Sequence, residues 1–356
     1  MFSLLNPSPL RSNETKGAEK MKRKIWVLIV AISAILALSA CGAKTQEDVT
    51  KDLTEKLGDI KGYKAHAKMT LKMGNEPQTY QIDVWHNQPD YYRVNLKNAQ
   101  RDQSQMILRN KEGVYVLTPA LNKSFKFQSE WPENSSQAYL YESLVKDILE
   151  DKNAKFSATK DYYVFETKTR YQNSKMLPTQ EIKLSKRSLA PVSVKVMDTD
   201  HNALVTVEFS KVDFNASFDK DAFDTNKNMT GAQLEVPVDA SASAKEFKVQ
   251  YPTADVGASL IDEKDIATDS GKRIVLTYGG DKSFTLVQEK AEVMPTAMVS
   301  TQAPGKIVDL GFTVGAMTDT SISWTYDGVD YMLASKDLSS DEMVMVARSV
   351  QGDIVK

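Results

Sequence analysis

The sequence predicts a mainly β protein of the α+β class, in which curved antiparallel sheets are covered by a few helices. Many short segments alternate apolar and polar residues with a period of two, as strands with one buried face do. Turn residues separate these segments at short intervals, which favours antiparallel neighbours. Only a few segments show the one-sided apolar stripe of a helix that packs on a sheet.

The composition narrows the class of protein. The chain has 356 residues, of which 41% are hydrophobic and 26% are charged. These values are typical of globular proteins and exclude a disordered chain, a collagen or a polytopic membrane protein. The length suggests two domains of about 150 residues each. Six of the 45 basic and two of the 47 acidic side chains lie in residues 1–40, so the remainder is mildly acidic, which disfavours nucleic acid as a partner.

Residues 1–40 predict a signal peptide. Residues 25–40 carry no charge and follow the basic run 22–24, and small residues come after them. The apolar stretch is shorter than the roughly 20 residues of a bilayer span, although an uncleaved signal anchor is the alternative. Either the basic region is unusually long or the true start is Met21, and the normal length of the signal from Met21 favours the second.

The signal ends in Leu38-Ser39-Ala40-Cys41, which resembles the lipobox of bacterial lipoproteins. That resemblance implies that Cys41 is diacylated on its sulfur, with long-chain groups such as palmitate, and becomes the mature N-terminus. Several acyl chains hold a protein firmly, so we expect it on the outer face of the cell membrane. Cys41 is the only cysteine, which excludes an internal disulfide and a cysteine-based zinc site.

The first domain, residues 41–224, is expected to begin with a helix over 45–59, capped by Thr45. A second helix, capped by Ser135 or Ser136, carries an apolar face from Ala138 to Leu149. Alternation predicts strands at 65–73, 80–84, 91–96, 105–108, 114–117, 124–127, 162–168, 180–185, 192–197 and 203–212.

Residues 225–245 are poor in large apolar side chains and are expected to be a linker to a small α+β domain at 246–356. In that domain, strands at 274–278 and 284–286 flank a Gly-Gly-Asp turn. Asp327-Gly328 between alternating segments predicts a tight hairpin. Ser339 and Glu342 form a capping box, which predicts a final helix.

Residues 84–93, Val-Trp-His-Asn-Gln-Pro-Asp-Tyr-Tyr-Arg, resemble a short stretch of the LolA/RseB-like lipoprotein-carrier superfamily. The resemblance covers about residues 45–224 and implies a strongly curved β half-barrel with an apolar concave face under helices. Segments 282–286, 323–328 and 338–342 resemble a domain of unknown function appended to sporulation lipoproteins. The whole architecture is similar to YdcC/GerS-type sporulation and germination lipoproteins.

We expect no catalytic residue, metal site or cofactor. A Gly-x-Ser-x-Gly motif is absent, and Ser270-Gly271-Lys272 lacks the other residues of a phosphate loop. The three histidines follow no catalytic spacing: His66, His86 and His201. Three residues spaced like cation ligands are better interpreted as a turn: Asp198, Asp200 and Asn202.

Six apolar residues are candidates for a groove that holds an acyl chain or a partner segment: Met69, Val84, Trp85, Tyr91, Tyr92 and Met106. The alternative is that they are sheet core, since such residues commonly form cores. The leading hypothesis is a non-enzymatic, membrane-anchored lipoprotein of sporulation or spore-envelope assembly that binds a lipid, a lipoprotein or an envelope protein.

Two mechanisms compete within that hypothesis. A wide cleft without charges favours acyl-chain binding, whereas a filled cleft favours an adaptor for a cell-wall enzyme. The rival hypothesis is an envelope hydrolase, which needs a polar cluster with perturbed titration inside a pocket. A histidine in a cleft beside a carboxylate would support that rival.

Overall fold

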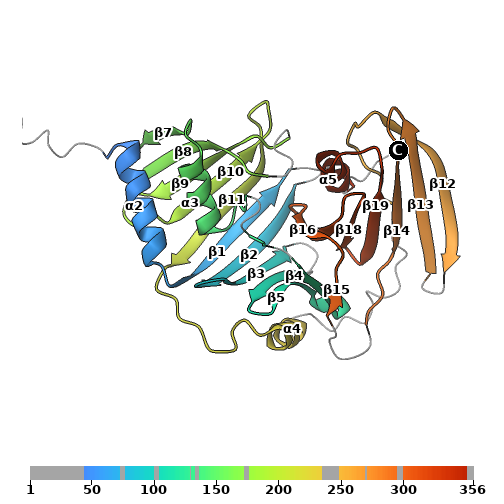
Figure 1. Ribbon diagram of the computed structural model, residues 1–356, viewed down its shortest axis with the longest axis horizontal. Coiled ribbons are helices and arrows are strands. Elements are labelled where there is room, and N and C mark those ends of the chain that lie inside the picture. Colours follow the sequence, from blue (N-terminus) through green and yellow to red (C-terminus); the bar gives the residue numbers. More distant parts are fainter. Residues whose placement is uncertain are drawn as a thin grey trace, which may run out of the picture. The chain divides into compact units, whose positions relative to one another are not determined.

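The computed structural model describes residues 44–72, 77–99, 104–128, 130–132, 136–171, 176–234, 248–268, 271–294 and 300–350. Residues 50–356 form one compact unit that contains two sheets, one of twelve and one of seven strands (Figure 1). The mainly β class and the curved sheet under helices are thereby confirmed. No helix in the described ranges is both long and apolar enough to cross a membrane. The expected domain boundaries stay predictions.

The large sheet is antiparallel except where β15 pairs with β6, and its spatial order is β15-β6-β5-β4-β3-β2-β1-β11-β10-β9-β8-β7. Its strands are β1 (Gly62–Leu71), β2 (Gln78–Asn87), β3 (Tyr91–Asn98), β4 (Ser104–Asn110), β5 (Gly113–Thr118), β6 (Lys123–Phe127), β7 (Lys155–Ala158), β8 (Tyr162–Lys168), β9 (Thr179–Ser185), β10 (Pro191–Met197), β11 (Ala203–Asp213) and β15 (Thr301–Gln302). A 3-10 turn, η1 (Pro119–Leu121), joins β5 to β6.

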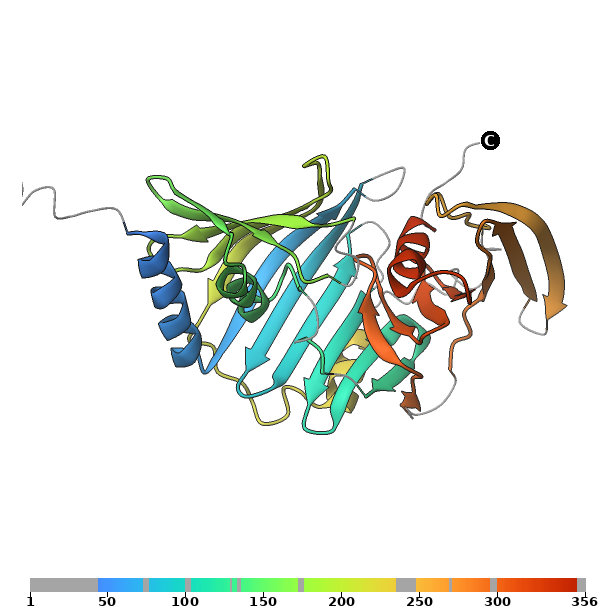
Figure 2. The ribbon, with the colours of Figure 1, turned by 45° about the horizontal axis from the view of Figure 1, so that its top comes forward.

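The predicted period of two decides which side chains of the large sheet are buried. On β1 the alternating apolar residues are buried, and they share a face with the alternating apolar residues of β2, because Met69 lies opposite Tyr80. We call this the inner face. Helix α3 (Tyr141–Glu150) lies over it (Figure 2) and buries Leu144, Val145 and Ile148. Helix α2 (Gln46–Asp59) begins after Thr45 as predicted, since the Thr45 hydroxyl accepts from the Asp48 amide at 3.2 Å.

The second predicted helix begins later than expected. Helix α3 starts at Tyr141, so Ala138 precedes it. Ser136 is no cap, because its hydroxyl donates to the Asp147 carboxylate in the middle of the helix at 2.9 Å. Ser135 lies outside the described residues. The short strand β7 carries no apolar alternation and was not predicted.

The expected linker contains a helix in its first half. Residues 225–234 form helix α4 (Thr225–Leu234), and residues 235–247 lie outside the described ranges. Met229 and Ala232 are buried although the segment has few large apolar residues, because these side chains meet a cluster on the large sheet. Asp224 accepts from the Lys227 amide at 2.8 Å, so an aspartate cap was the local signal for this helix.

The small sheet is antiparallel in the order β12-β13-β14-β19-β18-β17-β16. Its strands are β12 (Ala258–Thr268), β13 (Gly271–Gly280), β14 (Phe284–Lys290), β16 (Lys306–Asp309), β17 (Val314–Met317), β18 (Ser321–Tyr326) and β19 (Val329–Ala334). The predicted hairpin is confirmed, since Asp327 and Gly328 join β18 to β19 with φ of 51° and 71°. The capping box is also confirmed at helix α5 (Ser340–Ser349).

Strand β12 was not predicted. Its residues are exposed along almost the whole length, so no apolar alternation marks it in the sequence. Among the described strands it pairs with β13 alone, so it lies at an edge of the small sheet. Three large apolar side chains are exposed on it: Leu260, Ile261 and Ile266.

Candidate functional site

The six candidate groove residues do not line one groove, because they lie on opposite faces of the large sheet. The inner-face residues are Met69, Val84 and Tyr92, and the outer-face residues are Trp85, Tyr91 and Met106. Adjacent strand residues point to opposite faces, so Trp85 cannot share a surface with Val84. The expected groove therefore combined adjacent residues, such as Val84 and Trp85, whose side chains lie on opposite faces of the sheet.

On the outer face, the candidates belong to a covered cluster. Met106 is fully buried together with Phe223 and Met229, and Trp85 and Tyr91 pack against this cluster. The Trp85 ring lies between two cations, with the Lys64 Nζ 4.7 Å and the Arg93 guanidinium 4.3 Å from its centroid. On this face, the core interpretation of the apolar residues fits the structure.

On the inner face, the remaining candidates are also covered. Met69 and Val84 are 2% and 0% exposed, and Tyr92 is 6% exposed. The Tyr92 ring stacks on His86 at a centroid distance of 4.4 Å and meets the edge of Trp131. The described residues around these three candidates therefore form a filled surface rather than a wide cleft.

The three histidines have different surroundings. His66 contacts Asp83 through its Nδ1, and both side chains are exposed on the outer face. His201 occupies a turn with a φ of 61°, where Asp198 accepts from the amides of Asp200 and Asn202. Only His86 is buried beside a carboxylate, that of Glu142, among the described residues.

Buried His86 and Tyr63 form a polar chain with the half-buried Glu142, which links β2, α3 and β1. The His86 Nε2 lies 3.3 Å from Glu142 Oε1, and the Tyr63 hydroxyl donates to Glu142 Oε2 at 2.9 Å. His86 Nδ1 lies 3.1 Å from the Tyr91 carbonyl oxygen. Sequence reasoning missed this contact, because Glu142 carries no motif and lies 56 positions beyond His86.

Burial shifts the titration of this chain. It raises the pKa of Glu142 to about 7, and it lowers the pKa of His86 to about 4. It also raises the pKa of Tyr63 well above its ordinary value. A neutral Glu142 beside a neutral His86 is the form that these shifts favour near pH 6. The His86 residue is only 3% exposed and the Glu142 side chain 21% exposed, so the imidazole of this pair offers a substrate no open face.

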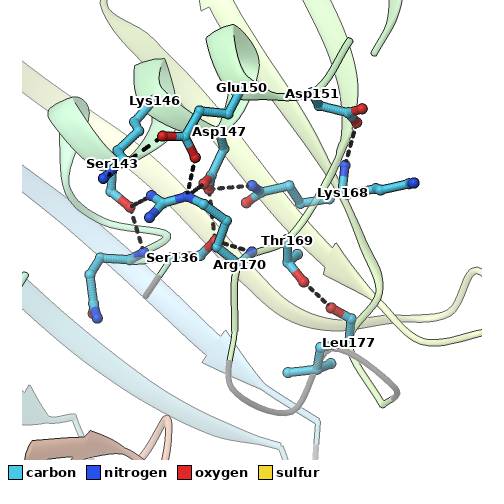
Figure 3. Close-up of polar contacts among 12 residues, drawn as sticks. Ser136, Ser143, Lys146, Asp147, Glu150, Asp151, Lys168, Thr169, Arg170 and Leu177 are labelled. Carbon is cyan, nitrogen blue, oxygen red and sulfur yellow. Dashed lines mark hydrogen bonds and ion pairs between the residues drawn. The ribbon is translucent and has the colours of Figure 1, made fainter. Parts of the chain in front are cut away.

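A second buried carboxylate on α3, Asp147, ties the helix to the end of β8 (Figure 3). Arg170 Nε contacts it at 2.5 Å, and it accepts from Gln180 Nε2 at 2.6 Å and from Ser136 Oγ at 2.9 Å. Burial raises the pKa of Asp147, while Arg170 and the neutral donors oppose that shift. Both oxygens of the Asp147 carboxylate have partners, which indicates an anchor for the helix.

The small sheet covers the inner face at the β4–β6 end of the large sheet. The Gln105 side chain accepts from the Val314 amide at 2.7 Å, and the Tyr326 hydroxyl donates to Gln78 at 2.7 Å. Lys123 pairs with Asp330 at 2.7 Å. These contacts join β4, β2 and β6 to the small sheet and its loops.

A cavity of about 180 Å³ remains between the two sheets. Its apolar lining consists of Val116, Phe125, Phe127, Ala303, Pro304, Val314, Ala316, Trp324 and Tyr331. The Lys123–Asp330 ion pair contributes to one wall, with Asp330 one-third exposed. The volume corresponds to about six water molecules at ~30 Å³ each, so it suits a benzene-sized group rather than a whole acyl chain.

Other predicted sites lie outside these clusters. Within the described ranges, no group of three or more His, Cys, Asp or Glu side chains is placed to hold a metal ion. The lipobox residues Leu38, Ser39, Ala40 and Cys41 lie outside the described residues.

Fold and site together define a mainly β protein whose large curved sheet is covered on its inner face. The family model described as "Sporulation protein YdcC-like" matches residues 22–223. The curated "Sporulation protein YdcC" of Bacillus subtilis (strain 168) is 54% identical over 339 residues, which cover 95% of this chain and all of that protein. The chain therefore belongs to the YdcC-like sporulation protein family, and the predicted resemblance to that family is confirmed.

Solved structures match at lower similarity. A Pseudomonas aeruginosa MucA/MucB complex contains a chain that is 14% identical, with a TM-score of 0.31, covering 85% of this chain and 96% of its own. The structure of the CwlD amidase of Clostridioides difficile in complex with the GerS lipoprotein contains a chain that is 17% identical, with a TM-score of 0.29, covering 50% of this chain and 98% of its own. These scores are too low to transfer a ligand or a partner to this protein.

Proposed function

We propose that this chain is a non-enzymatic lipoprotein, anchored through Cys41 on the outer face of the cell membrane, that acts in sporulation by binding another envelope protein. The covered surroundings of three inner-face candidates carry this proposal. Met69, Val84 and Tyr92 have almost no exposed surface, and the small sheet covers the β4–β6 end. An acyl carrier needs an open apolar cleft, typically of about 300–1,000 Å³.

The free edge of β12 supports a protein partner. The strand has eleven residues, and its second edge leaves backbone N–H and C=O groups available for another strand. Ile261 is 67% exposed, and Leu260 and Ile266 are more than 40% exposed. Exposed apolar side chains on an unpaired edge are a favourable surface for strand addition.

The position of His86 and Glu142 supports a non-enzymatic role. In the described residues, this is the only histidine–carboxylate pair with shifted pKa values. His86 is buried beneath Tyr92, and neither His86 nor Glu142 lines the 180 Å³ cavity. A general acid or base must come within hydrogen-bond reach of its substrate. The pKa values of the pair are shifted as in many catalytic sites, but a substrate cannot reach the His86 ring.

Lipidation is tested by growing the sporulating host with an alkyne-bearing palmitate. We expect the full chain to be labelled and membrane-bound, and Cys41→Ser to lose the label. Ser39→Gly, which keeps a small residue before the cleavage point, is the matched control and should be labelled. Membrane association of the Cys41→Ser variant at full signal-peptide length would instead favour an uncleaved anchor.

The partner role is tested with a photo-crosslinking amino acid at position 261 of the full chain. A control position, Lys195, is partly exposed on the outer face of the large sheet. We expect one envelope protein to crosslink at 261 and not at 195. That protein, once purified, should bind the wild-type chain and lose affinity for Ile261→Lys. Crosslinks at both positions, or binding that is indifferent to Ile261→Lys, would contradict a role for this edge.

The cavity favours a second candidate function, the binding of a short apolar group. Its lining is mostly aromatic and aliphatic, and a dry apolar cavity of similar size is able to hold benzene. Mass spectrometry of organic extracts from the natively purified full chain separates the candidates. An adaptor should yield no stoichiometric lipid. A stoichiometric apolar compound that is lost in Ala316→Leu would overturn the adaptor in favour of ligand binding.

A further inference from the structure

The directions of the hydrogen bonds around Glu142 limit where its protons lie. The Tyr141 amide donates to the Tyr63 hydroxyl oxygen at 3.3 Å, and the Tyr63 hydroxyl donates in turn to Glu142 Oε2 at 2.9 Å. Glu142 Oε2 is therefore an acceptor. Tyr63 is fully buried, so its hydroxyl has no water as an alternative partner.

The other end of the chain limits the tautomer of His86. Its Nδ1 lies 3.1 Å from the Tyr91 carbonyl oxygen, which only accepts, so Nδ1 carries a hydrogen. In the neutral ring, Nε2 then has a lone pair, and it faces Glu142 Oε1 at 3.3 Å. Oε1 is itself buried and has no hydrogen-bond partner as an unprotonated carboxylate oxygen. Two acceptors facing each other require one proton between them.

The surroundings supply no other charge to balance an ionised Glu142. Tyr92 stacks on His86, and Tyr141 packs against Phe214, whose ring is covered by Lys56 of α2 at 4.1 Å. Asp90, in the turn before β3, faces His86 but is paired with Arg109 at 3.4 Å. Among the described residues, no lysine or arginine pairs with Glu142.

We propose that Glu142 and His86 share a single proton that fastens the first turn of α3 to β1 and β2, and that loss of this proton at alkaline pH loosens the helix. With the proton, every group from the Tyr141 amide to the Tyr91 carbonyl has a partner. Without it, a carboxylate oxygen and a nitrogen lone pair oppose each other inside the sheet, which is unfavourable in a desolvated site. The raised pKa of Glu142, about 7, agrees with this geometry.

The tautomer is tested on the full chain in detergent, labelled with ¹⁵N-histidine. The protein has three histidines, so His66→Gln and His201→Gln variants assign the His86 signals. We expect His86 to remain neutral, with hydrogen on Nδ1, from pH 5.5 to 7. A neutral ring with its hydrogen on Nε2, or a ring that titrates near pH 6.5, would overturn the proposal without any mutation of the cluster.

The fastening is tested by hydrogen exchange of the α3 amides, corrected for intrinsic exchange rates. Between pH 6 and 8.5 we expect protection in the wild-type chain to fall by about tenfold, the equivalent of one pKa unit. In Glu142→Gln the amide nitrogen donates to His86 and the amide oxygen accepts from Tyr63 at every pH, so protection should stay constant. Equal pH dependence in both chains would overturn the proposal.

Discussion

Helix α3 holds one carboxylate at its start and another at its middle, and the two groups have different partners. Asp147 meets a guanidinium and two neutral donors, Arg170, Gln180 and Ser136. Glu142 meets one hydroxyl and one histidine, and no lysine or arginine is paired with it in the described part of the chain. Burial raises the pKa of both, but only at Asp147 does a cation oppose the shift.

The difference shows that burial alone does not determine whether a carboxylate is charged. Removing water disfavours the charged form at both positions. A cation and several donors compensate an ionised group, whereas a single neutral donor and a histidine lone pair favour the protonated one. The same helix is therefore fastened by an ion pair at its middle and by a shared proton at its start.

The largest expected effect is at the Asp147 end. Replacing Arg170 by Ala leaves Asp147 buried without its cation, which should lower the free energy of unfolding by about 3–5 kcal/mol. Denaturant unfolding of the full chain at pH 7 measures this loss. A loss below about 1 kcal/mol would mean that Gln180 and Ser136 satisfy the carboxylate alone, and the contrast between the two ends would disappear.

The next effect is at the Glu142 end and depends on pH. The pKa of Glu142 in the folded chain, about 7, lies above its ordinary value of 4.5. Its contribution to stability is therefore fully present below pH 4.5 and is lost as the pH rises through 7. Glu142→Gln should be more stable than wild type at pH 8, by about 1–3 kcal/mol, and nearly equal at pH 5.

Thermal unfolding of both chains from pH 5 to 8.5 measures this difference. His86 contributes in the opposite sense, because its lowered pKa favours the folded state above pH 6.5 and disfavours it as the pH falls toward 4. The pair should therefore contribute a flat profile between about pH 4.5 and 6.5. The difference between the two chains should nevertheless rise across that interval, because Glu142→Gln removes only the Glu142 contribution. A difference that stays constant from pH 5 to 8.5 would contradict the raised pKa of Glu142.

A smaller effect is expected when the neutral donor is removed. Tyr63→Phe deletes the hydroxyl that donates to Glu142, which should cost about 1 kcal/mol at pH 6. The cost should increase at pH 8, because the ionised carboxylate depends on that donor more than the protonated one does. A cost that is the same at both pH values would indicate lost packing rather than a lost hydrogen bond.

The smallest effect is expected at an exposed ion pair on the same helix. Lys146 Nζ lies 3.9 Å from Glu150 Oε1, and both side chains are more than 40% exposed. Lys146→Ala should change the free energy of unfolding by no more than about 0.5 kcal/mol. A loss of stability as large as that of Arg170→Ala would show that burial is not the reason why the Arg170–Asp147 pair contributes more than the Lys146–Glu150 pair.

Local patterns predicted much of the secondary structure. Alternation located β1 to β6 and β8 to β11 to within a few residues. The Asp327-Gly328 turn and the Ser339–Glu342 capping box formed as expected, because both depend on residues close together in the chain. Strand β12 escaped prediction, since nearly all its side chains are exposed and pairing with β13 alone holds it.

The candidate site was far less predictable. Trp85 and Val84 were assigned to one groove although alternation already placed them on opposite faces, so that part of the error was avoidable. The burial of Met106 could not be predicted in this way, because it depends on helix α4. That helix has too few apolar residues to be recognised from the sequence before its contact with the large sheet is known. The contact between His86 and Glu142 likewise joins distant segments that carry no shared motif.

The sequence by itself determined the mainly β class, the order of most strands and the tight hairpin, because these follow from side-chain alternation and turn chemistry within a few residues. The tertiary structure alone decided that Met69, Val84 and Tyr92 are covered, that Asp147 has a cation and that Glu142 has a histidine. Burial and charge compensation depend on groups from separate strands and helices, and only the packing of those elements brings them within hydrogen-bond distance.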